Sequence, residues 1–265
     1  VIRLVLENGL RVNLSRFLDT HLLHSELALN GEEAHADSVD AVREMLDEIE
    51  HHGVFGAAFD AVMQRIRHKG ADHVEQDELI ARVRDKVPET RGELLSFFHD
   101  RLKVHLREQG ISHDVIDACL DMPNSDDFVL LVNRAMALQA FLRTEDGTNL
   151  LQGFKRANNI LTAEEEKDGV FYELDPDPKL AEDATEKHLF AALDAAEAAI
   201  APALKAEDFA EAMASMAALR GPIDAFFDTV QVNAENAMIR RNRLCLLNRI
   251  RTVMGQVAQF NAIEG

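Results

Sequence analysis

Five arginines lie within thirteen residues near the carboxyl end of the chain, in the stretch IRRNRLCLLNRIR from residue 239 to residue 251. No Asp or Glu occurs between Asn236 and Ala262, although the whole chain has a formal net charge of −19. Clustered guanidinium groups bind phosphate oxygens, and they also hydrogen-bond nucleic-acid bases. The stretch is therefore a candidate nucleic-acid contact, in a chain whose overall charge opposes indiscriminate binding of DNA or RNA.

Helical geometry separates these basic residues by role, because each residue of a helix advances by about 100°. One arc of the helix holds Arg240, Arg241, Asn248 and Arg251. The opposite, core-facing side holds Ile239, Leu246, Leu247, Ile250, Val253, Met254 and Val257. We expect the first group to face solvent as a binding surface. The alternative is an ordinary solvated face whose charges complement the helix carboxyl end or pair with acidic neighbours.

Arg243 falls in the middle of the apolar side, and Arg249 lies on a flank. A buried arginine needs a carboxylate partner, because an isolated charge is costly to remove from water. We therefore predict that Arg243 is structural and pairs with Asp224 or Asp228.

A second stretch also departs from the acidic background, since no acid occurs from Gly147 to Ala163. Lys155 and Arg156 are adjacent there, and Asn159 follows. These three residues are candidate RNA contacts, with a plain solvated helix face as the alternative. We expect no exposed aromatic side chain for base stacking.

The motifs of known catalytic chemistry are missing. The chain has no phosphate-binding glycine loop, no dinucleotide fingerprint and no H-E-x-x-H pair. His51 and His52 are neighbours, and neighbours on a helix point about 100° apart, which does not suit one shared metal ion. The His-Asp pairs that begin at His99 and His113 lack further ligands at matching positions. We expect no catalytic residue, no metal site and no cofactor in this chain.

Composition favours an all-α protein. The chain is rich in Ala, Glu, Leu and Arg, with six Pro and no Trp among 265 residues, and these are good helix formers. The two cysteines, Cys119 and Cys245, are too few for a disulfide framework and suit a reducing compartment. No uninterrupted apolar run is long enough to cross a membrane, and no secretory signal pattern opens the chain. A cytoplasmic location is expected.

Apolar periodicity predicts a helical bundle. Val39, Val42, Leu46 and Ile49 form a stripe that Gly53 ends, and a second pattern runs up to Pro88. Further helices are predicted from residue 90 onward, interrupted by an exposed acidic loop near 162–185. We divide the chain into a helical connecting region, residues 1–89, and a helical domain, residues 90–265.

Several motifs together resemble one family. Those motifs are the FFDTVQVN segment at Phe226–Asn233, the helix at Arg240–Leu247, the run at Val257–Phe260, and the upstream stretches ELLSFFHDRLKVHLREQGISHDVIDACL and FKRANNIL. They are similar to the carboxyl-terminal part of the beta subunit of bacterial glycyl-tRNA synthetase. The resemblance implies an anticodon-binding domain named for an Asp-Ala-Leu-Arg motif. Here the corresponding stretch is Ala237-Met238-Ile239-Arg240, which keeps only the arginine.

The resemblance also implies a function. In this family a separate alpha subunit uses ATP and holds the aminoacylation site, and the beta subunit binds glycine tRNA, in an expected heterotetramer. The chain would then be a non-catalytic part of a ligase. Arg240, Arg241, Asn248 and Arg251, with Lys155, Arg156 and Asn159, would contact the tRNA, without a membrane or DNA partner. Two other hypotheses stay open, namely a helical scaffold that docks a partner subunit without touching RNA and a relic of a metal-dependent phosphohydrolase.

Overall fold

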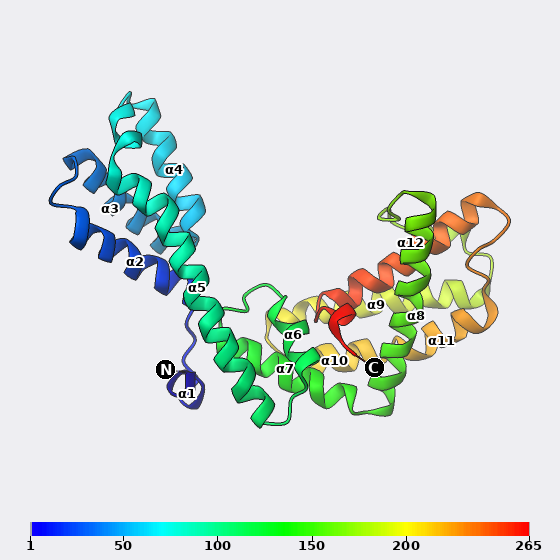
Figure 1. Ribbon diagram of the computed structural model, residues 1–265. Coiled ribbons are helices and arrows are strands. Elements are labelled where there is room, and N and C mark those ends of the chain that lie inside the picture. The colour runs from blue at the N-terminus through cyan, green and yellow to red at the C-terminus, as the bar shows by residue number, and fades with distance from the viewer. Residues whose placement is uncertain (1, 265) are drawn as a thin grey trace. The chain divides into compact units, whose positions relative to one another are not determined.

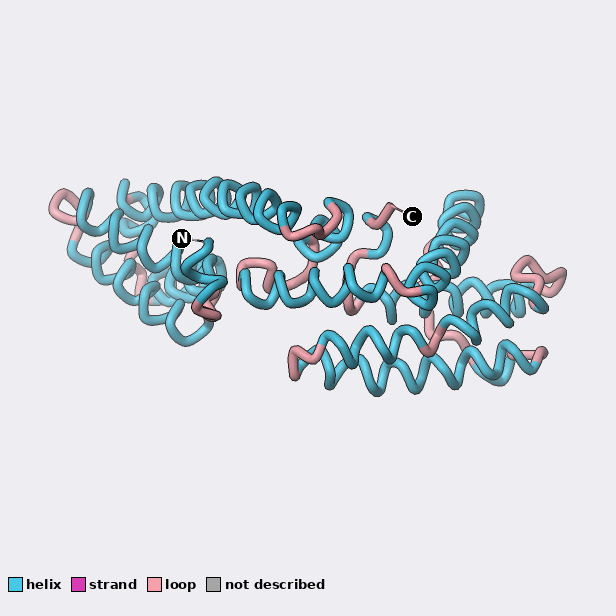
Figure 2. The backbone as a smooth tube through the Cα atoms, turned by 90° about the horizontal axis from the view of Figure 1, so that it is seen from below, coloured by secondary structure: helices cyan, strands magenta, loops and turns pink. Residues whose placement is uncertain are grey.

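The computed structural model describes residues 2–264, apart from the side chain of His52, and the described residues contain helices and loops but no strand (Figures 1 and 2). This confirms the all-α prediction. The helices are α1 (Ile2–Glu7), α2 (Leu14–Asn30), α3 (Ala36–His52), α4 (Phe55–His68), η1 (Asp72–Gln76), α5 (Glu78–Glu108), α6 (His113–Leu120), α7 (Phe128–Leu142), α8 (Glu145–Asp168), η2 (Pro178–Leu180), α9 (Ala184–Lys205), α10 (Phe209–Ala217), α11 (Arg220–Thr229), α12 (Ala237–Gly255) and η3 (Phe260–Ala262).

The chain forms two compact units. The first contains residues up to 105 together with 126–129, and the second contains residues 106–125 and those from 130 onward. The expected boundary after residue 89 is wrong, because the first unit runs on to residue 105. Helix α5 continues without a break through Pro88 to Glu108, so Pro88 does not end an element there. Val83 and Val87 are buried on the turns before Pro88. Their burial holds this part of the helix although proline removes one backbone hydrogen bond.

The first unit packs α3 against both α2 and α4. Val42 and Ile49 are fully buried, and Val39 and Leu46 pack against the same core, as the stripe predicts. Gly53 ends α3 with a left-handed backbone at φ +73°, and its N–H donates to the carbonyl of Ile49. A residue with a Cβ atom is strained in that conformation, so the glycine is a true helix stop.

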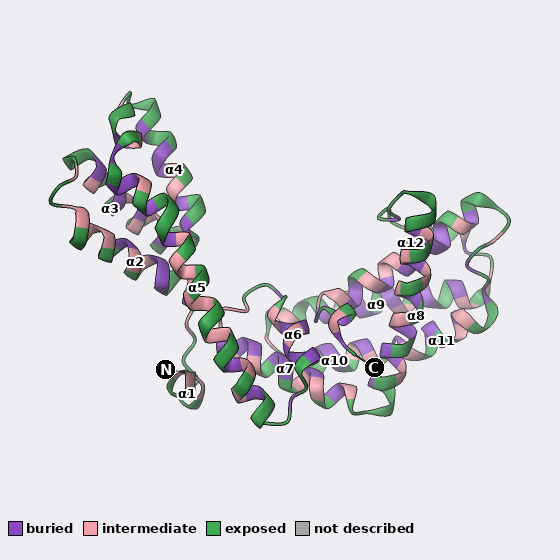
Figure 3. Cartoon of the chain, viewed as in Figure 1, coloured by how far each residue is buried: buried purple, intermediate pink, exposed green. Residues whose placement is uncertain are grey.

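The second unit packs α8, α9, α11 and α12 around a shared core, with α10 on α9. Buried residues alternate with exposed ones along each of these helices (Figure 3). The acidic stretch expected as a loop from residue 162 is helical up to Asp168, and Gly169 ends α8 with φ +65°. Leu161 and Glu165 are buried on the inner face of α8, so packing carries the helix through its acids. The loop proper joins Gly169 to α9.

No helix of residues 2–264 is long and apolar enough to span a membrane.

Candidate nucleic-acid interface

Helix α12 begins at a side-chain cap. The Asn236 side-chain oxygen accepts the backbone N–H groups of Met238 at 2.9 Å and Ile239 at 3.3 Å, which satisfies two of the donors that the first turn leaves free. The core-facing residues predicted from the helical period are all buried, namely Ile239, Leu246, Leu247, Ile250, Val253, Met254 and Val257. The face of α12 that packs is therefore the one that the sequence predicts.

Arg243 is buried within this face, as predicted, with 9% of its side chain exposed. Its partner is Glu186, at the start of α9. Arg243 Nε donates to Glu186 Oε1 at 2.7 Å, and Nη2 donates to Oε2 at 2.9 Å. A third donor, Nη1, reaches the Gln231 carbonyl at 2.9 Å. The guanidinium is thus held at three points.

The predicted partners Asp224 and Asp228 are wrong. Both lie on α11 with exposed side chains, and Asp224 faces Arg220 at 3.8 Å. A buried ion pair is favourable only when hydrogen bonds also satisfy the remaining polar atoms of both partners. Glu186 meets this condition, because it is buried and already accepts two backbone N–H groups. The sequence did hold a signal, since Asp183 and Glu186 form a capping box before an apolar run.

Burial would raise the pKa of Glu186, but hydrogen bonds from Arg243 and from the backbone N–H groups of Asp183 and Glu182, with the positive charge of Arg243, lower it overall. The carboxyl group is therefore ionised at neutral pH, and the pair is a true ion pair. The hydrogen bonds between Arg243 and Glu186 raise the pKa of Arg243, against the opposing effect of burial.

Arg240 does not stand free in solvent. It forms ion pairs with Glu164 and with Asp168 at 2.6 Å, both on α8, and it donates to the Tyr172 hydroxyl at 3.2 Å. Only 22% of its side chain is exposed. Hydrogen bonds to the Asp168 and Glu164 carboxylates raise its pKa. The arginine ties the start of α12 to the end of α8.

Arg251 is engaged in the same way. Its guanidinium meets both oxygens of Glu165 on α8 at 3.2 Å, and it also donates to the Asn248 side-chain oxygen at 2.8 Å. The prediction of a free, solvent-facing cationic arc is therefore wrong for Arg240 and Arg251. An RNA contact by either residue, or by Asn248, stays a prediction.

Arg249 lies on the side of α12 that faces α9, and it too is paired with acids. It forms an ion pair with Asp194, and its Nε and Nη2 donate to the Glu197 carboxylate oxygens at 3.1 and 2.8 Å. Figure 1 shows α12 beside α8 and α9, the two helices that supply these acids. Four of the five arginines are thus neutralised by carboxylates. We call Arg240, Arg243, Arg249 and Arg251 the arginine hub. The absence of acids from α12 follows from this architecture, because its arginines neutralise the acids of the neighbouring helices.

Arg241 is the exception. Its side chain is exposed, and among the residues that the structure describes it forms no ion pair. It is the arginine of α12 that remains available to a phosphate group.

The second predicted group lies earlier on α8. Lys155 is half-buried, whereas Arg156 and Asn159 are exposed. The Arg156 guanidinium lies 4.4 Å from the ring centroid of Phe227 on α11, which is a cation–π contact. Within residues 2–264, no hydrogen bond or ion pair joins these three residues to α12. Lys155 and Arg156 are therefore basic residues on α8 that are separate from α12.

The expectation that no aromatic side chain is exposed is wrong. Phe171, in the loop after α8, is 77% exposed, and Leu174 is 61% exposed. Between them Tyr172 is buried, and its hydroxyl donates to Asp168. The anchored tyrosine fixes the backbone that presents Phe171. The sequence held one signal for an exposed apolar residue, namely the alternation of apolar and acidic residues in this loop. The alternation does not reveal which of the apolar side chains faces solvent.

In the described part of the chain, no three His, Cys, Asp or Glu side chains come close enough together to hold a metal ion. Both cysteines are buried free thiols.

Comparison with known proteins bears directly on this region. Residues 150–260 match the DALR anticodon binding domain, a range that covers Lys155, Arg156 and the whole of α12. The chain is 52% identical, over 267 aligned residues and its full length, to the glycine–tRNA ligase beta subunit of Dinoroseobacter shibae, of which it covers 33%. It is 71% identical over 173 residues to that of Cereibacter sphaeroides, and 55% identical over 175 residues to that of Rhodospirillum centenum.

Over its full length the chain is similar to the glycine–tRNA ligase beta subunits. It spans 24% to 33% of the length of these relatives.

The stretch that stands for the namesake Asp-Ala-Leu-Arg motif is Ala237–Arg240. Met238 is 64% exposed, Ile239 is buried, and Arg240 holds α12 to α8. The retained arginine therefore has a structural role that requires neither of the first two motif residues.

Proposed function

We propose that this chain is the tRNA-binding part of a glycine–tRNA ligase beta subunit. It would position glycine tRNA for ATP-dependent aminoacylation by an alpha subunit, within a cytoplasmic heterotetramer. The chain itself would supply no catalytic group and no ATP site. The single observation that carries the proposal is the anticodon binding domain match over residues 150–260.

The electrostatics support the same role. Arg241, Lys155 and Arg156 offer cations to backbone phosphates, and Phe171 offers a ring on which an unpaired base can stack. The net charge of −19 repels RNA from the rest of the surface, which favours docking through these basic residues. The arginine hub would contribute by holding α8, α9 and α12 in fixed positions.

The direct test compares binding of glycine tRNA with that of the same tRNA carrying a swapped anticodon, by filter binding at fixed salt. We expect at least tenfold weaker binding of the swapped tRNA, since each lost base contact costs about 1–3 kcal/mol. Equal binding of both would refute anticodon recognition. Failure to bind either tRNA, with retention of the alpha subunit on co-purification, would favour a protein scaffold instead.

A further inference from the structure

A cavity of about 350 Å³ lies between the loop after α8 and the outer side of α12. Besides the loop residues 173–176, it is lined by Glu197, Cys245, Asn248, Arg249 and Thr252. Its size is at the lower end of the range for small-molecule sites, which suits a guest the size of one nucleotide. The arginine hub explains Arg249 and Glu197 but leaves the cavity itself without a role.

The loop wall of this cavity is fixed in place. Asn242 Nδ2 donates to the Asp177 carbonyl at 3.0 Å, and Asn242 Oδ1 accepts the Asp177 N–H at 2.7 Å. At the other end of the loop, Tyr172 is bonded to Asp168 and Arg240. The segment between these anchors is a pre-formed wall, which lowers the entropy cost of binding a ligand.

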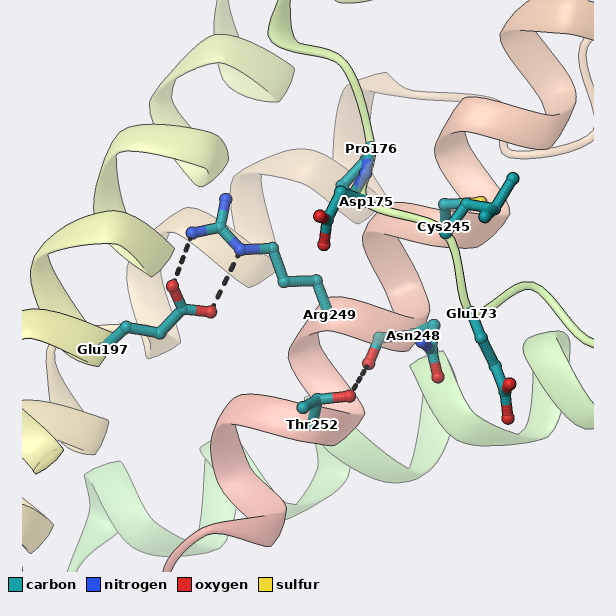
Figure 4. A pocket seen from close by; sticks show the side chains of 9 residues that line it. Glu173, Asp175, Pro176, Glu197, Cys245, Asn248, Arg249 and Thr252 are labelled. Carbon is teal, nitrogen blue, oxygen red and sulfur yellow. Dashed lines mark hydrogen bonds and ion pairs between the residues drawn. The ribbon is translucent and has the colours of Figure 1, made fainter.

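Three side chains of the cavity lining, namely Glu173, Asp175 and Asn248, have hydrogen-bonding atoms without a partner among the described residues, and the last two extend toward each other's helix or loop. Asp175 extends from the loop toward α12, between Arg249 and Cys245 (Figure 4). Among the residues that the structure describes, its carboxylate accepts no hydrogen bond. Asn248 has its oxygen engaged by Arg251 at 2.8 and 3.1 Å, which leaves its NH2 group free to donate. The cavity therefore pairs an anionic acceptor with a neutral donor whose orientation is set by its neighbour.

This arrangement complements the Watson–Crick edge of cytosine. Cytosine carries an exocyclic amine beside the acceptors N3 and O2, and acidic side chains accept from that amine. Uracil has a carbonyl oxygen in place of the amine, which a carboxylate repels. Leu174, which lines the cavity and is 61% exposed, can contact the base face. Arg241 lies outside the lining, one helical turn before Cys245 on α12, where it can meet a phosphate of the same strand.

We propose that this cavity binds one unpaired cytosine of the anticodon loop, with Asp175 accepting from the exocyclic amine and Asn248 donating to N3 or O2. The inference rests on the proposed function and deepens it. Glycine codons begin with guanines, so every glycine anticodon carries the cytosines that pair with them. Arg251 and Glu165 act here as positioning residues, because they orient Asn248.

The test measures binding of the chain to unmodified glycine tRNA transcripts in which each anticodon cytosine is changed singly to uracil. At one of the anticodon cytosines, the wild-type chain should bind the uracil transcript about tenfold more weakly than the unchanged transcript. Asp175→Asn should bring that ratio close to one, because the amide can donate to the uracil oxygen, and should leave the ratio at the other cytosine unchanged. Asn248→Ala should lower the same ratio through loss of the other partner.

Glu166→Gln is the matched control, since Glu166 is an exposed acid of α8 outside the cavity. It removes one repulsive charge, so it should strengthen binding of both RNAs together and leave the cytosine-to-uracil ratio unchanged. Thermal unfolding of each variant shows that the fold is intact. A tenfold ratio that survives Asp175→Asn overturns the assignment while leaving anticodon recognition standing. A wild-type chain that ignores the anticodon overturns both.

Discussion

Replacing Glu186 by Gln tests the buried centre of the arginine hub. Glu186 accepts four hydrogen bonds, two from Arg243 at 2.7 and 2.9 Å and two from the backbone N–H groups of Asp183 at 3.0 Å and Glu182 at 3.1 Å. Its side chain is 1% exposed. The substitution keeps the shape and one acceptor, but it leaves the buried Arg243 charge with only the exposed Glu182 carboxylate, 3.6 Å away, as a counter-charge.

Removing one partner of a buried ion pair lowers the free energy of unfolding by about 3–5 kcal/mol. Because the Gln variant keeps an amide acceptor, we expect a loss of about 3 kcal/mol. For a unit of this size each kcal/mol lowers the melting temperature by about 2–4 °C, so we expect a loss of about 6–12 °C. The assay is thermal unfolding of the wild-type and variant chains by circular dichroism at neutral pH.

Two companion variants sharpen the result. Glu182→Gln removes a carboxylate that lies 3.6 Å from Arg243 but is 67% exposed, so it should lower the melting temperature by less than a quarter as much. Arg243→Met in the Glu186→Gln background removes the stranded charge and should restore part of the loss. A Glu186→Gln chain as stable as wild type, or a double variant no better than the single one, would refute the reasoning.

Two further predictions concern stability. Glu164, Asp168 and Glu186 have pKa values lowered from 4.5, 3.8 and 4.5. Their contribution to the stability of the second unit is therefore complete above those unfolded-state values and is lost as pH falls through the lower native ones. Melting temperatures should drop steeply below about pH 4.5, and a flat profile would contradict this. Gly147→Ala should also destabilise strongly, because a Cβ there would meet the Phe141 carbonyl oxygen at 2.1 Å, whereas Gly221→Ala, which meets nothing within 4 Å, should not. Equal melting temperatures for the two alanine variants would contradict the packing argument.

The sequence predicted those features of α12 that depend on the helix alone. Its apolar face and the burial of Arg243 follow from the 3.6-residue period. The partner of Arg243 did not follow, because Glu186 lies 57 residues away and only packing of α9 on α12 brings them together. The boundary after residue 89 failed because Pro88 is tolerated inside α5.

The free cationic arc was mispredicted for a related reason. Glu164 and Asp168 were interpreted as part of a solvated loop, yet they are one helical turn apart on α8 and both reach Arg240. An acidic run that continues a helix presents its charges on fixed faces. Whether those faces meet an arginine is decided by the crossing of two helices, which no local pattern reveals.

The salt dependence of glycine tRNA binding, measured for Arg241→Gln and Arg240→Gln, separates the free arginine from the paired ones. If Arg241 contacts a phosphate and the arginine hub does not, Arg241→Gln should reduce the slope of log affinity against log salt by about 0.7–0.9. Arg240→Gln should change that slope by less than half as much, while lowering the melting temperature. A larger slope change for Arg240→Gln than for Arg241→Gln would show that the ion pairs of α12 open to bind RNA, contrary to the role assigned to them here.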